Sequence, residues 1–102
     1  MLSALVLFDI TSWYHFAMNS KQRKTLERVF ATPAPHLKIE WQEIERLLIA
    51  CGAQVLEADG SAIRIILGER CAFLHRPHPQ KEAKAYQVKA VRELLESAGV
   101  RP

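Results

Sequence analysis

The chain has 102 residues, a formal net charge of +3, and a composition that is 49% hydrophobic and 25% charged. These values fit one small globular domain whose core is just large enough to fold alone. The two cysteines, Cys51 and Cys71, exclude a framework built on disulfides, so we expect a reducing, cytoplasmic setting.

The N-terminal residues 1–17, MLSALVLFDITSWYHFA, differ in character from the rest of the chain. No Lys or Arg precedes the apolar run, as a secretory signal would require, and Asp9 interrupts it. A transmembrane helix would need about 20 apolar residues, so no membrane partner is expected. We interpret residues 1–17 as a translated upstream stretch and Met18 as the natural start of a single domain, residues 18–102. The alternative is an added hydrophobic element that packs on the domain or drives association.

Apolar spacing and end signals predict the elements that follow. A short helix has Ser20 as its N-cap and ends before TPAPH, residues 32–36. A clearer helix has Trp41 on its apolar side and ends at Gly52. Asp59-Gly60 and Gly68-Glu69 separate three strands, and Pro77 ends the last strand. The predicted elements are helices within residues 19–31 and 40–52, strands at 54–58, 61–67 and 70–75, and a helix at about 86–98.

This order predicts an α+β fold: a two-layer sandwich of a three-stranded antiparallel sheet with helices on one face, plus an extra N-terminal helix. Alternation in the middle strand puts Ile63, Ile65 and Leu67 on one face and Ala62, Arg64 and Ile66 on the other. Trp41 and Phe73 are expected in the core.

Charge is distributed unevenly along the chain. Residues 21–28 carry a local charge of +3, residues 40–57 a charge of −3, and residues 75–92 a charge of +4. A concentrated basic segment is typical of proteins that bind a polyanion. The alternative is a solvated helix face.

The helix-strand-strand-strand-helix core resembles the double-stranded RNA-binding fold, and short motifs narrow the resemblance. These motifs are Gly60-Ser61 after the hairpin turn, Pro77-His78-Pro79 after the third strand, Lys81-Glu82, and Ala98-Gly99 at the end of the last helix. Together they resemble the HicA family of toxins from toxin–antitoxin pairs, over about residues 41–100. The resemblance implies an RNA-binding mRNA endonuclease that needs no small-molecule cofactor and is silenced by a HicB-like antitoxin protein.

The chain departs from the family pattern at one important position. HicA proteins usually place their catalytic histidine directly after Gly-Ser, and this chain has Ala62 there. A methyl group neither moves a proton nor holds a phosphate. We therefore predict that His78, with His75 second, supplies the proton transfer that RNA cleavage requires. Two alternatives stay open: a member that binds RNA without cutting it, and a basic module that only docks an acidic antitoxin.

Cationic and aromatic side chains supply the candidate RNA contacts. Arg64 shares a face with Ala62 and is able to grip a phosphate through two hydrogen bonds. Lys81 and Lys84 are expected on flanking phosphates, and Tyr86 against a base. The full set of RNA-binding candidates is Arg64, Arg76, Lys81, Lys84, Tyr86 and Lys89.

Each candidate also has an ordinary structural interpretation. His78 orders a turn, His75 ends an edge strand, Arg64 lies on a solvated face, and Tyr86 packs at a helix start. Cys71, with the two histidines, gives only three metal ligands and no matching partner pair, so no metal site is expected.

Overall fold

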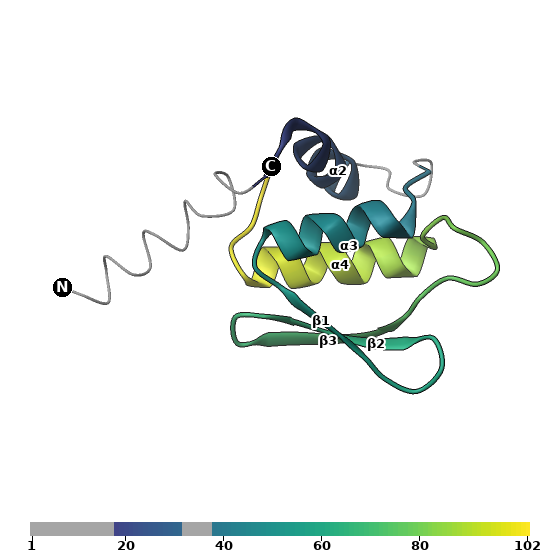
Figure 1. Cartoon of the computed structure of the whole chain (residues 1–102). Helices are drawn as coiled ribbons and strands as arrows, with labels where there is room; N and C mark the ends of the chain where they lie inside the picture. The colour runs from purple at the N-terminus through teal and green to yellow at the C-terminus, as the bar shows by residue number, and fades with distance from the viewer. Residues whose placement is uncertain (1–17, 32–37) are drawn as a thin grey trace.

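The computed structural model describes residues 18–31 and 38–102 (Figure 1). The interpretation of residues 1–17 and the predicted TPAPH stop lie outside the described residues. In chain order the elements are α2 (Ser20–Phe30), α3 (Trp41–Ala50), β1 (Gln54–Glu57), β2 (Ala62–Leu67), β3 (Arg70–His75) and α4 (Ala85–Ser97). The predicted α+β fold is confirmed, and the predicted boundaries agree with these elements to within one or two residues.

The three strands form one antiparallel sheet in the order β1-β2-β3. The hairpin between β1 and β2 is closed by the Ala58 N–H, which donates to the Ala62 carbonyl over 2.9 Å. Gly60 lies in this turn with a φ of 61°, in the left-handed region that glycine enters without steric cost. The register pairs Ala62 with His75 and Arg64 with Phe73, so these side chains share the same face of neighbouring strands.

The helices cover only one face of the sheet. In Figure 1, α3 and α4 lie side by side against the sheet, and α2 lies on their far side, away from the strands. The opposite face of the sheet has no helix of the described chain on it. The predicted extra helix therefore forms a third layer, and the likeness to the double-stranded RNA-binding fold stays a prediction.

The core lies between the sheet and the helix pair. Ile63 and Ile65 of β2 are fully buried against apolar residues of α3 and α4, and burial of each such side chain stabilises the fold by about 1.5–3 kcal/mol. The buried apolar residues of the two helices are Trp41, Ile44, Leu47 and Leu48 of α3, and Val88, Val91, Leu94 and Leu95 of α4. The apolar side predicted for the helix with Trp41 is thus confirmed, and α4 buries an apolar stripe in the same way.

Helix α2 is capped locally at its start and held to α4 at its end. The prediction of Ser20 as N-cap is wrong by one residue: Asn19 Oδ1 accepts the Gln22 N–H over 2.8 Å, and Gln22 Oε1 accepts the Asn19 N–H over 3.0 Å. This reciprocal pairing is a capping box. At the other end, Arg92 of α4 donates to the carbonyl of Val29 over 2.9 Å and to that of Ala31 over 3.0 Å.

The expected core position of Phe73 is wrong. Its ring is 58% exposed on the open face of the sheet, whereas Trp41 is buried as expected. The register explains the difference, because Leu74 pairs with Ile63 on the core side and its neighbour must then point outward. Adjacent apolar residues in a strand give no alternation signal, so sequence alone did not show which of the two faces the core.

Candidate nucleic-acid interface

The connector between β3 and α4, residues 76–84, is held to the domain by Arg76. Arg76 Nε donates to Glu45 Oε2 over 2.7 Å and Nη2 donates to Glu45 Oε1 over 3.2 Å, while Nη1 reaches Glu57 Oε1 over 2.7 Å. Hydrogen bonds from Arg76 lower the pKa of Glu57, and the two carboxylates raise the pKa of Arg76 further above its already high range. Because two carboxylates neutralise its charge, Arg76 fastens β3 to α3 and β1 instead of offering a free cation.

The far end of the connector is held by backbone pairing. The Trp41 N–H donates to the Lys81 carbonyl over 2.8 Å, and the Ala83 N–H donates to the Ile39 carbonyl over 2.8 Å. These bonds place Lys81 and Lys84 next to the start of α3, and both side chains are exposed. The connector is therefore anchored at both ends, and the backbone that carries its exposed lysines is held in place.

Gln87 links this connector to the end of β3 and was missed in the sequence. Its side chain is 1% exposed; Nε2 donates to the His75 carbonyl over 2.6 Å, and Oε1 accepts the Lys84 N–H over 2.7 Å. Its spacing in the sequence could have shown its burial, because it lies four residues before Val91 on the apolar side of α4. A buried amide must have hydrogen-bond partners. Gln87 thus positions the backbone of His75.

His75 lies at the last position of β3 with its side chain on the open face. It pairs in register with Ala62, and its Nδ1 lies 3.3 Å from Ser61 Oγ, within hydrogen-bond distance. The Arg76 N–H also donates to the Ser61 carbonyl over 2.8 Å, which continues the β2–β3 pairing past the strand ends. The imidazole is therefore the cross-strand neighbour of position 62.

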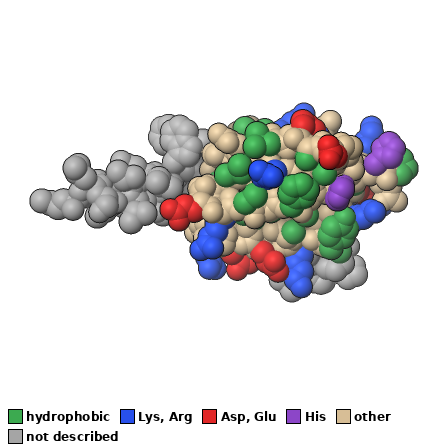
Figure 2. All heavy atoms as spheres, turned by 90° about the horizontal axis from the view of Figure 1, so that it is seen from below, with side chains coloured by type: hydrophobic (Ala, Val, Ile, Leu, Met, Phe, Trp, Pro, Cys, Tyr) green, Lys and Arg blue, Asp and Glu red, His purple; other side chains and the backbone are tan. Residues whose placement is uncertain are grey.

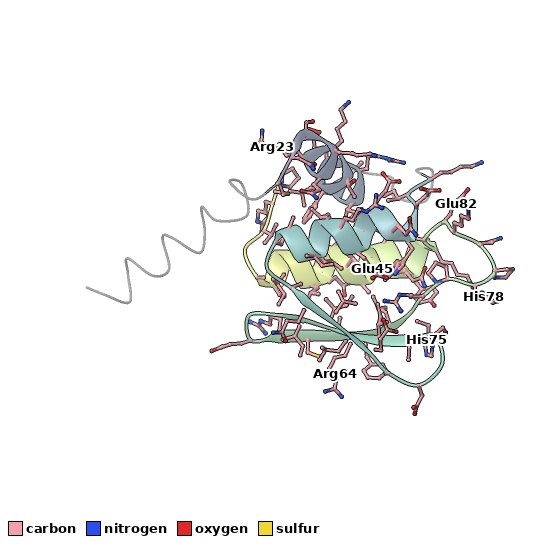
Figure 3. All side chains as sticks on the ribbon, in the orientation of Figure 1. Arg23, Glu45, Arg64, His75, His78 and Glu82 are labelled. Carbon is pink, nitrogen blue, oxygen red and sulfur yellow. The ribbon has the colours of Figure 1, made fainter. Side chains whose placement is uncertain are left out.

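His78 lies elsewhere. Figure 3 shows His78 out on the connector loop and His75 at the end of the sheet. Within the described residues, no hydrogen bond joins the two rings or links His78 to another side chain. The two predicted proton-transfer residues flank one corner of the domain without forming a contacting pair.

Arg64 points away from the helices, into solvent (Figure 3). Its guanidinium carbon lies 5.8 Å from the centroid of the Phe73 ring, a distance typical of a cation–π contact. Figure 2 looks onto this open face and shows hydrophobic side chains gathered around a basic one, with a histidine at their edge. The strand residues whose side chains lie on this face are Gln54, Leu56, Ala62, Arg64, Ile66, Cys71, Phe73 and His75.

The remaining RNA-binding candidates lie on the adjoining edge. Lys81 and Lys84 on the connector, and Tyr86 and Lys89 on α4, are all exposed. These residues lie near one another because the connector leads directly into α4. The connector and the start of α4 lie at the same end of the domain as His75 (Figure 1). An open face with Arg64 and an edge with lysines therefore meet at His75.

The cysteines differ in environment. Cys51 is buried, and burial raises the pKa of its thiol to about 11, whereas Cys71 is exposed. Across residues 18–31 and 38–102, no group of three His, Cys, Asp or Glu side chains is placed to hold a metal ion. In that same part of the chain, no helix has the length and apolar character needed to cross a membrane.

Comparison with known families gives a match to the part of the chain that contains the sheet, the two helices that cover it and the connector. The profile described as the HicA toxin of bacterial toxin–antitoxin matches residues 41–100. The match begins at the first residue of α3 and ends shortly after α4, so α2 lies outside it. No curated protein and no solved structure shows significant similarity to the chain.

Proposed function

Because the chain belongs to the HicA toxin family of bacterial toxin–antitoxin systems, we propose that it acts as an RNA-binding mRNA endonuclease in the cytoplasm and that a HicB-like antitoxin silences it. Membership of this family shows that the chain is a toxin and implies a cognate antitoxin. The RNA chemistry is our proposal, and the observation that carries it is the register of Ala62 with His75. An imidazole from the neighbouring strand lies beside the position where the family histidine is absent.

In the proposed reaction, His75 takes the proton of a ribose 2′-hydroxyl, and the 2′-oxygen attacks the adjacent phosphorus. The bond from phosphorus to the 5′-oxygen breaks, and the leaving oxygen receives a proton from His78 on the connector. The products are a 2′,3′-cyclic phosphate and a 5′-hydroxyl. Imidazole suits both steps because it exchanges protons near neutral pH.

Positive side chains are proposed to stabilise the charge that develops on the phosphate. Arg64 lies on the same face as His75 and is exposed, which supports a contact with the reacting phosphate. Lys81, Lys84 and Lys89 are proposed to hold flanking phosphates, and Tyr86 to contact a base. Arg76 is proposed to contribute by fixing the connector through Glu45 and Glu57.

Two other functions remain as alternatives within the same family. One is a toxin that binds RNA without cutting it, which the alanine at position 62 favours. The other is a basic module that only docks an acidic antitoxin. RNA binding weakens steeply with salt because counterions are released, whereas a protein interface with an apolar core weakens less.

Cleavage of a long single-stranded RNA in the presence of a chelator tests the proposal. We expect wild-type protein to yield fragments with 2′,3′-cyclic phosphate ends, and His75→Ala and His78→Ala each to cut more slowly by about 10²-fold or more. The matched control measures the affinity of His75→Ala for uncleavable RNA, which should be close to the affinity of wild type. Undiminished cleavage by a protein that lacks both imidazoles would refute the assignment, and salt-sensitive binding without any cleavage would favour the inactive alternative.

A further inference from the structure

The open face of the sheet carries an uncovered aromatic ring. Phe73 is 58% exposed and Leu56 is 44% exposed, and both pair in register with Arg64, one on each side. Most large apolar side chains of the described chain are buried, so two exposed ones flanking a cation mark this row as unusual. Apolar side chains that gather on an exposed surface are typical of a binding site.

The charge of this face indicates what kind of group it binds. Arg64 lies close to the ring of Phe73, His75 lies two residues further along β3 on the same side, and no strand residue on this face is acidic. The face therefore combines a flat apolar surface with a cation, and its strand residues include no carboxylate that would repel an anion. A nucleotide has the matching chemistry, because it joins a flat base to a phosphate.

The spacing along β3 relates this surface to the proposed reaction centre. Two residues along a strand span about 6.6 Å, so Phe73 and His75 are separated by roughly one step of the pleat. A base stacked on Phe73 would leave its own ribose and phosphate in reach of His75 and Arg64. The face thus offers one location for the base and an adjoining one for the backbone.

We propose that Phe73, with Arg64 beside it, is a stacking surface for an unpaired base and that the substrate is single-stranded RNA. The proposal rests on the proposed function and adds to it the form of RNA that this centre accepts. In a duplex the faces of the bases are already stacked on each other, so a base-paired strand offers no ring to Phe73. Recognition by stacking tolerates all bases, since every base has a flat face.

The test measures binding of the full chain to an uncleavable 2′-O-methyl oligonucleotide of about ten unpaired nucleotides, and to its duplex. Phe73→Leu keeps an apolar side chain and removes the flat ring, and we expect it to weaken single-strand binding about tenfold. Phe73→Trp should bind at least as well as wild type. Its added indole fluorescence should be quenched by the single strand, beyond any change in wild type, and not by the duplex.

Salt dependence separates stacking from charge. Phe73→Leu should leave the slope of log affinity against log salt unchanged, whereas Arg64→Gln should reduce its magnitude by about one. Lys84→Gln on the connector is the matched control, because it should weaken binding through charge without altering the quenching in Phe73→Trp. These contrasts distinguish a base on Phe73 from a general attraction to RNA.

Several outcomes would overturn the inference. Single-strand binding by Phe73→Leu at wild-type strength, with Lys84→Gln weakened, would remove the stacking surface and leave the proposed function intact. No binding of the oligonucleotide by wild type would overturn both. Unchanged RNA binding with weakened antitoxin binding in Phe73→Leu would make this face a protein interface. Even if Phe73→Leu folded poorly, absence of quenching in a folded Phe73→Trp at saturating RNA would refute the proposal.

Discussion

Replacing Gln87 with Leu should destabilise the domain and disturb the candidate site at once. The buried amide donates to the His75 carbonyl over 2.6 Å and accepts the Lys84 N–H over 2.7 Å. A leucine of similar size leaves both backbone groups without their partner, and an unpaired group costs about 1–3 kcal/mol when fully buried and less when partly buried, as here. After the gain from the added apolar surface, we expect a net loss of about 2 kcal/mol in the free energy of unfolding.

Urea unfolding followed by circular dichroism measures this loss, with Gln42→Leu on the exposed side of α3 as the matched control. The change at Gln87 should also slow RNA cleavage under conditions where the variant is fully folded, because His75 loses the bond that holds its carbonyl. A Gln87→Leu protein as stable as wild type would refute the reasoning. A stability loss with unchanged cleavage would show that Gln87 supports the fold and does not position His75.

Gln87→Glu extends the same reasoning to pH. The Glu side chain still accepts the Lys84 N–H, but it donates to the His75 carbonyl only when it is protonated. Burial and that carbonyl should therefore raise the pKa of this Glu in the folded state above its unfolded value of about 4.3. The variant should then be most stable relative to wild type below that unfolded value and lose stability as pH rises through the folded value. A difference in unfolding free energy that is independent of pH would contradict this.

Three further predictions concern the connector, the core and the thiols. Arg76→Gln should lower the free energy of unfolding, because it removes the partner of Glu45 and Glu57. Since Arg76 lowers the pKa of Glu57, the difference from wild type should be fully present above the ordinary carboxyl pKa and shrink as pH falls from there through the lowered one, in urea unfolding at several pH values. Ile65→Ala should cost about 2–5 kcal/mol, and a loss below 1 kcal/mol would contradict its central burial. At pH 8 an alkylating reagent should modify Cys71 and spare Cys51 in the native protein, as mass spectrometry of peptides would show.

Local patterns in the sequence were enough to predict the elements and the family. Alternation in β2 and the turn pair before it predicted the strand and the residues of its two faces, and apolar spacing predicted the helices α3 and α4. The motifs around Gly60-Ser61 and Pro77-His78-Pro79 led to the family that the profile match shows. These signals are readable because side-chain direction repeats every two residues in a strand and about every 3.6 in a helix.

Tertiary structure alone decided which distant residues meet. The register put His75 across from Ala62 and turned Phe73 outward, and packing of the connector paired Arg76 with Glu45, which lies 31 positions away in the chain. No local pattern contains this information, because a shift of one residue in strand register exchanges the two faces while the composition stays the same. Element type follows from short-range periodicity; the candidate site follows from how the sheet, the helices and the connector pack together.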